Sequence, residues 1–161
     1  MINSRCIVLV GMPGSGKTTV GRDLAKRLGL RFVDSDHEIE GEDGFRKRET
    51  QTLDALTRES NMVLATGGGA VIRPENRALL RERAVVVFLS VPPQILWERT
   101  RHDRSRPLLQ VADPKGRLEE LLKARGPFYR EVAHIIVEGG RGTPSAMVKM
   151  IEKELQALCE P

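Results

Sequence analysis

Short runs of apolar, mostly β-branched residues alternate along the chain with longer stretches in which apolar positions recur every three or four residues. The short runs predict buried strands, and the longer stretches predict helices. We expect strands at residues 6–10, 31–33, 62–65, 84–89 and 134–137, and helices at residues 17–28, 45–60, 74–82, 92–100, 118–124 and 144–158. Strands joined by helical crossovers pair in parallel, so the pattern predicts an α/β fold with a five-stranded, doubly wound sheet flanked by helices.

The length of the chain suits one domain. Its 161 residues and 40% hydrophobic content suffice for a single sizeable core, and neither a repeat nor a linker interrupts the pattern. We therefore predict one domain over residues 1–161. The longest stretch without strand or helix periodicity, residues 101–116, is rich in arginine and contains Pro107 and Pro114, which predicts a mobile loop.

The charge balance favours small anionic ligands. Lysine and arginine number 26 against 22 aspartates and glutamates, a formal net charge of +4. Aromatic residues make up only 4% of the chain and do not interleave with a basic run, so we expect no nucleic-acid partner. The apolar runs are too short for a signal peptide or a membrane span, and Cys6 and Cys159 suggest neither a disulfide framework nor a metal site. We predict a cytoplasmic monomer without a membrane partner.

The clearest motif lies at residues 11–18, which read G-M-P-G-S-G-K-T and match the phosphate-binding pattern G-x-x-x-x-G-K-[ST]. The motif follows a predicted strand and opens a predicted helix, as phosphate binding requires. Lys17 is expected to contact the β- and γ-phosphates of ATP, and the Thr18 hydroxyl is expected to ligate Mg²⁺. The alternative is a glycine-rich turn that only joins the strand to the helix. We predict an ATP site formed by Gly14, Ser15, Gly16, Lys17, Thr18 and Thr19.

A carboxylate for the metal is expected at the end of a core strand. The strand at residues 62–65 runs into Thr66 and three glycines, whereas the strand at residues 31–33 runs directly into Asp34. Asp34 is therefore the predicted metal carboxylate, directly or through water. Asp36 lies two residues further on and would face the same side if the strand continued. The alternative is that Ser35 or Asp36 caps a short helix at residues 37–40.

Three consecutive glycines, Gly67, Gly68 and Gly69, follow the third predicted strand. Residues without side chains expose backbone N–H groups and allow a ligand to approach closely, so this triplet predicts the floor of a second ligand site. The alternative is a flexible turn before the helix that starts at Pro74.

Taken together, these motifs resemble the shikimate kinase family over nearly the whole chain. The resemblance rests on the phosphate-binding loop, Asp34-Ser35-Asp36, Gly44-Phe45-Arg46 with Glu49, the triplet at 67–69, Arg106-Pro107-Leu108-Leu109, and Arg125 with Tyr129. It implies a P-loop kinase fold with an acceptor-binding segment at about 34–60 and a lid at about 101–116. The implied reaction moves the γ-phosphoryl group of ATP, with Mg²⁺, onto a hydroxyl of shikimate in aromatic amino-acid biosynthesis.

The resemblance also implies roles for individual residues. Shikimate-binding positions would be Asp36, Arg46, Gly67, Gly68, Gly69 and Arg125; catalytic positions would be Lys17, Asp36 and Arg106; and Arg99, Arg106 and Pro144 would contact the nucleotide. A guanidinium matches a carboxylate bidentately, which agrees with two arginines gripping an acidic acceptor. Glu49 lies three residues after Arg46 on the same helix face and is placed to orient it. Asp36 would orient the acceptor hydroxyl or act as its base.

Two other functions stay open at this point. One is another small-metabolite kinase, such as a gluconate kinase, and the other is a nucleotide-binding regulatory module with a degenerate acceptor site. The connection from Glu40 to Phe45 is shorter than the family pattern. Either the acceptor lobe is truly shortened, or a segment has been left out between residues 39 and 42. The second interpretation predicts consecutive Cα atoms much farther apart than about 3.8 Å.

Overall fold

The computed structural model describes residues 6–35, 45–102 and 112–159. The predicted strands form one parallel sheet in the order β2-β3-β1-β4-β5. The strands are β1 (Cys6–Val10), β2 (Arg31–Asp34), β3 (Met62–Ala65), β4 (Ala84–Ser90) and β5 (Ile135–Glu138). Each boundary lies within one residue of the prediction, and the predicted fold class is confirmed.

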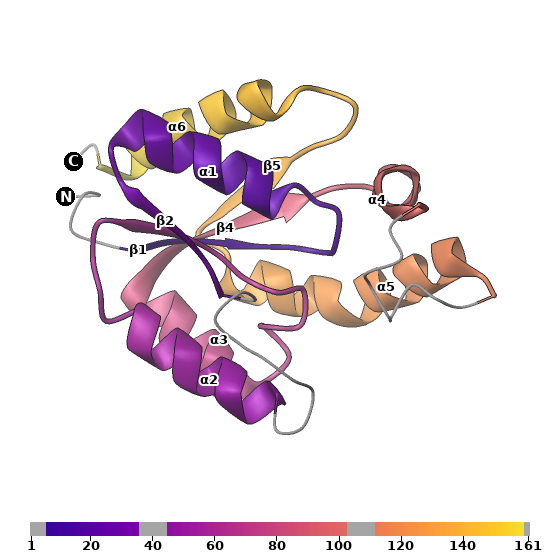
Figure 1. The fold of residues 1–161 in the computed structure, drawn as a ribbon, viewed down its shortest axis with the longest axis horizontal. Coiled ribbons are helices and arrows are strands. Elements are labelled where there is room, and N and C mark those ends of the chain that lie inside the picture. The colour runs from indigo at the N-terminus through magenta and orange to yellow at the C-terminus, as the bar shows by residue number, and fades with distance from the viewer. Residues whose placement is uncertain (1–5, 36–44, 103–111, 160–161) are drawn as a thin grey trace.

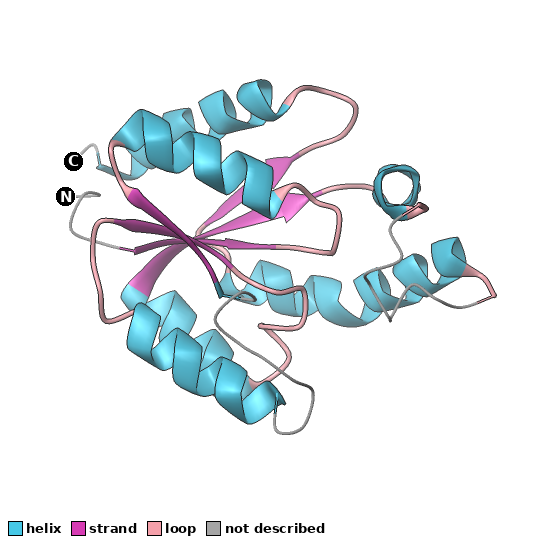
Figure 2. Ribbon diagram, in the orientation of Figure 1, coloured by secondary structure: helices cyan, strands magenta, loops and turns pink. Residues whose placement is uncertain are grey.

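Helices cover both faces of the sheet (Figures 1 and 2). The helices are α1 (Lys17–Leu28), α2 (Phe45–Leu56), α3 (Pro74–Arg83), α4 (Pro93–Thr100), α5 (Pro114–Val132) and α6 (Pro144–Cys159). Helices α1 and α6 pack together on one face, while α2, α3 and α5 cover the other. Helix α4 lies beyond the carboxyl end of β4. Because both faces are covered, β1 and β3 are buried at every position, which explains their uninterrupted apolar sequences.

The order of the strands creates a crevice at the carboxyl end of β1. The chain crosses from β1 past β3 to reach β2, and later returns to the other side of β1 with β4. In open α/β sheets, ligands bind where the direction of the connections reverses in this way. The loops that follow β1, β3 and β4 therefore emerge side by side at one edge of the sheet.

Helix α5 is longer than the sequence predicted, so the loop predicted at residues 101–116 is wrong over residues 114–116, which are helical. The helix runs over Pro114–Val132 rather than residues 118–124. Proline at the first helical position is favourable because its missing N–H would have no partner there, and the Asp113 carboxylate caps the helix by accepting from Gly116 N at 3.1 Å. The helix also continues through Pro127. Residues 103–111 of the predicted lid lie outside the described residues.

Helix α1 ends at a glycine that the backbone conformation requires. Gly29 adopts the left-handed conformation, with φ of 69° and ψ of 30°. The following residue, Leu30, donates its N–H to Ala25 O at 2.8 Å, which satisfies a carbonyl of the last helical turn. The turn directs the chain into β2, whose last residue is Asp34.

We predict that Gly29→Ala lowers the free energy of unfolding by about 1 kcal/mol, because a Cβ is unfavourable in the left-handed conformation. No atom lies within 4 Å of an added Cβ at Gly29, so steric overlap would not contribute. Gly142→Ala is the matched control, since Gly142 is exposed, has equally open space and does not have positive φ. Urea unfolding should show a loss for the first variant only. Equal stabilities of the two variants would contradict this account of the turn.

Candidate active site

The loop between β1 and α1 is arranged for anion binding. Ser15 N donates to Met12 O at 3.1 Å within the loop, and Val20 N donates to Gly16 O at 2.8 Å as the helix starts. The first turn of α1 contains no acidic residue of its own, which favours anions at the positive end of the helix dipole. This loop and helix N-terminus therefore form a site that attracts phosphate oxygens.

Lys17 lies across this loop. Its Nζ atom donates to Gly11 O at 2.5 Å and to Met12 O at 3.3 Å. Beside it, the buried Ser15 hydroxyl has no hydrogen-bond partner within the described part of the chain. An ammonium group and a buried hydroxyl at one loop match the donors that a phosphate chain requires.

Thr18 and Asp34, which the sequence predicted as metal ligands, lie together. Thr18 Oγ1 donates to Asp34 Oδ2 at 3.2 Å, from the first turn of α1 to the end of β2. Among the described residues there is no cluster of three or more histidine, cysteine, aspartate or glutamate side chains that could hold a metal ion. A hydroxyl and one carboxylate are nevertheless hard oxygen donors of the kind that Mg²⁺ uses when phosphates and waters complete its shell. These two side chains fit such an ion.

A cleft of about 810 Å³ extends from the phosphate-binding loop to the connection between β5 and α6. Arg99 bridges its two ends, since Nη1 donates to Gly14 O at 3.1 Å and Nη2 donates to Gly140 O at 2.7 Å. The walls of the cleft comprise residues 13–20, Asp34, Thr66, Gly68, Ile95, Glu98, Arg99, residues 138–144, Ala146, Met147 and Met150. Arg99 and Pro144, both predicted to flank the nucleotide base, thus face one cleft with the phosphate-binding loop.

An ion pair that was not predicted from the sequence lies in the wall of this cleft. Arg141 makes a bidentate contact with Glu98, at 2.9 and 3.0 Å, and Gln94 Nε2 donates to Glu98 Oε1 at 3.2 Å. The hydrogen bonds from Arg141 and then Gln94 hold the pKa of Glu98 below its usual value. The pair joins α4 to the β5–α6 connection, two segments whose separation in sequence gave no signal of contact.

The glycine triplet brings the predicted acceptor residues together. A Cβ at Gly69 would overlap the Arg46 guanidinium, and a Cβ at Gly68 would lie 3.2 Å from Arg125 Nη1 and 3.0 Å from Pro13 Cδ. The triplet is therefore a contact surface for two arginines from different helices. Its neighbour Pro13 belongs to the phosphate-binding loop, so the predicted acceptor floor and the ATP site are adjacent.

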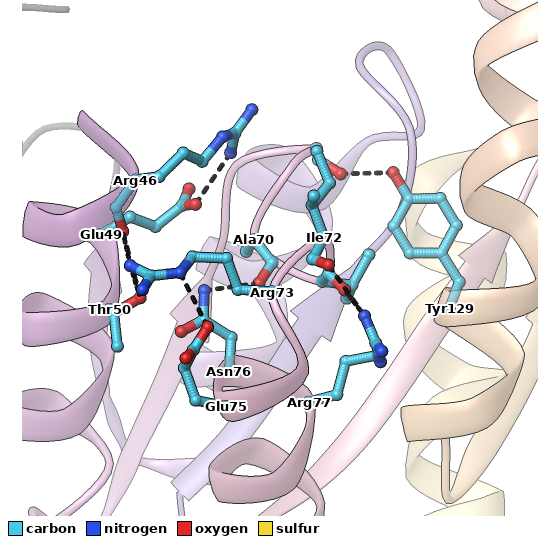
Figure 3. A network of polar contacts seen from close by, with 12 residues as sticks. Arg46, Glu49, Thr50, Ala70, Ile72, Arg73, Glu75, Asn76, Arg77 and Tyr129 are labelled. Atoms are coloured by element: carbon cyan, nitrogen blue, oxygen red, sulfur yellow. Dashed lines mark hydrogen bonds and ion pairs between the residues drawn. The ribbon is translucent and has the colours of Figure 1, made fainter. Parts of the chain in front are cut away.

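Arg46 is held by its own helix, as the spacing predicted. Its Nη1 atom pairs with Glu49 Oε1 at 2.8 Å, and Glu49 is only 1% exposed. Arg73, which the sequence analysis did not select, reaches across from the start of α3 and donates to Arg46 O at 3.1 Å and to Thr50 Oγ1 at 3.0 Å (Figure 3). These contacts anchor the first turn of α2 against the loop that follows the glycines.

Tyr129 approaches the same glycines from α5. Its hydroxyl donates to Gly68 O at 2.6 Å, and its ring stacks on Phe88 of β4 with centroids 5.0 Å apart. Burial raises the pKa of Tyr129 to about 12, and the charge of Arg125 and a hydrogen bond from it offset only part of this effect. The Tyr129 hydroxyl therefore stays neutral and lies next to one of the two acceptor arginines.

Two predicted site residues cannot be placed. Asp36 and Arg106 lie outside the described residues, and so do the helix considered at residues 37–40 and the short connection before Phe45. Their roles stay predictions.

A parallel sheet whose first strand leads into this loop, with a cleft for a nucleotide and a second floor beside it, defines a P-loop small-molecule kinase. A family model described as shikimate kinase matches residues 13–156. The chain belongs to the shikimate kinase family.

Individual relatives agree with this assignment. Shikimate kinases of Aromatoleum aromaticum and Dechloromonas aromatica are 58% and 54% identical to the chain, covering 93% and 96% of it and 94% and 92% of their own lengths. The solved structure of an Acinetobacter baumannii shikimate kinase in complex with shikimate is 44% identical, with a TM-score of 0.94 over 99% of this chain and 97% of that one. A gluconokinase from Sinorhizobium meliloti, at 21% identity and a TM-score of 0.58 over 99% of this chain and 100% of that one, shares the fold.

The alignment with the Aromatoleum aromaticum protein also bears on chain length. It extends over 164 positions but includes 93% of the 161 residues here, which is about 150, so about 14 positions of that relative have no counterpart.

Within residues 6–35, 45–102 and 112–159, no helix is both long enough and apolar enough to cross a membrane.

We predict that Tyr129 titrates about two pH units above a free tyrosine, since its folded pKa is about 12 and the unfolded value is near 10. It is the only tyrosine, so tyrosinate absorbance reports on it alone. Because the folded pKa is raised, the neutral hydroxyl contributes stability fully below pH 10, and this contribution is lost as the pH rises toward 12. Protein unfolded in guanidinium is the control and should titrate near pH 10. A midpoint near 10 in folded protein would disprove the burial argument.

Proposed function

We propose that the chain transfers the γ-phosphoryl group of ATP to a hydroxyl of shikimate. The observation that carries this proposal is the convergence of Arg46 and Arg125 on Gly68 and Gly69, directly beside the phosphate-binding loop. Family membership and the shikimate complex of the Acinetobacter baumannii relative support the choice of acceptor.

The acceptor side is suited to a carboxylate. Each guanidinium offers parallel N–H donors that match two carboxylate oxygens, and Arg125 is 7% exposed, so its charge is little screened by water. The partner of Arg46, Glu49, is buried and fixes that guanidinium beside Gly69. An acidic ring compound held here would present a hydroxyl toward the adjacent phosphate site, which is the positioning that phosphoryl transfer requires.

The ATP side supplies charge stabilisation. The acceptor oxygen forms a bond to the γ-phosphorus while the bond to the bridging oxygen of ADP breaks, and negative charge spreads over the phosphoryl oxygens. Lys17 and the N–H groups at the start of α1 stabilise this charge, and Arg106 is proposed to add a further positive charge. The acceptor hydroxyl loses its proton late, and Asp36 is proposed to orient that hydroxyl and receive the proton.

We propose that Thr18 and Asp34 hold Mg²⁺ together with the phosphates. Bound there, Mg²⁺ would neutralise charge on the β- and γ-phosphate oxygens. Thr18 contributes its hydroxyl oxygen, and Asp34 contributes its carboxylate directly or through water. The hydrogen bond between these two groups supports the assignment, because it brings both oxygens to one point of the cleft.

Gluconate phosphorylation is the second candidate, because a gluconokinase shares the fold and gluconate also carries a carboxylate. The gluconokinase is only 21% identical to this chain, whereas the shikimate kinases named above are 44% or more identical to it. A regulatory module without an acceptor site is less compatible with two arginines gathered at a glycine floor. A coupled ADP-release assay with shikimate, with gluconate and without acceptor, together with an ATP-binding measurement, distinguishes the three. A single kinase domain, a monomer and a cytoplasmic location remain parts of the proposal.

We predict that Lys17→Ala and Asp34→Ala each reduce turnover with shikimate at least about 100-fold, because both remove groups that organise charge on the phosphates. Lys26→Ala, an exposed lysine later on α1, is the control and should retain turnover. Steady-state assays with saturating ATP and shikimate test this. Near-normal turnover of Lys17→Ala or Asp34→Ala would refute the role proposed for that residue at the phosphates.

We predict that Arg125→Lys raises the KM for shikimate about tenfold or more while changing the KM for ATP little, since the charge remains but the planar fork is lost. Arg117→Lys on the same helix is the matched control, because the Arg117 guanidinium makes a long ion pair with Glu120, at 3.5 Å, and does not line the nucleotide cleft. Initial rates over a range of both substrates provide the two constants. Equal increases in both constants would argue against a carboxylate clamp.

A further inference from the structure

The loop over residues 67–73 is fixed through its carbonyl groups. Gly68 O accepts from the Tyr129 hydroxyl, and the carbonyls of Gly67 and Gly69 accept from amides within the turn. From α3, Asn76 donates to Ala70 O at 2.9 Å, and Arg77 donates to the next two carbonyls at 2.9 Å each (Figure 3). The loop is thus held from the protein side rather than being a flexible turn.

The hydrogen bond that Gly68 O accepts from Tyr129 fixes the direction of the next backbone donor, the N–H group of Gly69. No peptide bond among the described residues is cis, so the carbonyl of Gly68 and the N–H of Gly69 point to opposite sides of one planar group. Figure 3 shows Tyr129 on one side of this loop and Arg46 on the other. Holding Gly68 O against Tyr129 therefore turns Gly69 N–H away from Tyr129, on the side where the Arg46 guanidinium meets Gly69.

The Tyr129 hydroxyl has a second neighbour in the site. Arg125 lies one turn earlier on α5, and its guanidinium is close enough to lower the pKa of Tyr129 against the effect of burial. The tyrosine itself is fully buried and stacks on Phe88 in the sheet, so its oxygen has a fixed position. One hydroxyl thus connects a backbone group of the floor and an arginine of the proposed carboxylate grip.

We propose that Tyr129 is a positioning residue for the acceptor. Its hydroxyl holds the Gly68 peptide so that Gly69 N–H can donate to an acceptor oxygen, and it holds Arg125 toward the acceptor carboxylate. Tyr129 itself does not touch the substrate. This inference rests on the proposed function, because it assigns Tyr129 to the recognition of an acidic, hydroxylated acceptor and not of ATP.

Tyr129→Phe tests the proposal, since it removes one oxygen and keeps the stacked ring. Gly68 O would lose its partner and the peptide would be free to rotate. We expect the KM for shikimate to rise about tenfold, the size of effect that follows from one buried hydrogen bond left unmade. The Tyr129 hydroxyl also meets the phosphate-binding loop, through a long 3.7 Å contact with Met12 Sδ, which is a weak acceptor. The KM for ATP should nevertheless stay within about twofold, because the hydrogen bonds of Lys17, Thr18 and Arg99 go to other groups.

Thr57→Val is the matched control. The Thr57 hydroxyl is also buried and also donates to a backbone carbonyl, Leu53 O, at 2.6 Å, but it lies at the far end of α2 from Arg46. Thr57→Val should lower the free energy of unfolding about as much as Tyr129→Phe does. It should leave the KM for shikimate and the KM for ATP unchanged. A loss of stability alone therefore cannot produce the expected difference between substrates.

A second measurement covers the case in which Tyr129→Phe is too unstable for kinetics. Saturating shikimate and saturating ATP each raise the melting temperature of a protein that binds them, and each shift is read from the variant's own baseline. In Tyr129→Phe, the shikimate shift should shrink while the ATP shift is retained. Equal effects on both ligands, or no effect on shikimate, would overturn the role of Tyr129. Wild-type protein that fails to phosphorylate shikimate would instead overturn the proposed function.

Discussion

The parallel alignment of β1, β3 and β4 is the constraint on which the rest of the site depends. Because these neighbouring strands point the same way, the phosphate-binding loop, the glycine triplet and the start of α4 emerge at one edge of the sheet. The strands themselves are buried and apolar, so they fix the positions of these loops without taking part in binding. Helices on both faces then bring in the charged side chains that the edge of the sheet lacks.

The sheet, the phosphate-binding loop and the pairing of Thr18 with Asp34 could be predicted, because each follows from local signals: apolar runs, a motif between strand and helix, and an acid at a strand end. The convergence of Arg46 and Arg125 needed the resemblance to a family, since nothing local links two arginines on separate helices. The Arg141–Glu98 pair could not be predicted, because it depends on how a loop folds over the cleft. The start of α5 was misjudged because Pro114 was included in the loop predicted at residues 101–116, although this proline opens the helix.

Different kinds of contact hold the two halves of the site. On the nucleotide side, exposed arginines such as Arg99 and Arg141 join separate loops through contacts that water can compete for. On the acceptor side, Glu49, Asn76 and Tyr129 are buried, and their hydrogen bonds are protected from solvent. The contacts that hold the acceptor floor are therefore less open to competition from water than those that hold the nucleotide wall.

The narrow fit around Gly68 couples the two halves of the site. A Cβ added at Gly68 would lie 3.0 Å from Pro13 Cδ of the phosphate-binding loop and 3.2 Å from Arg125 Nη1 of the acceptor grip, and the Gly68 carbonyl accepts from Tyr129. A side chain there would press on the phosphate-binding loop and on an acceptor arginine together, so a single substitution would disturb both halves of the site at once.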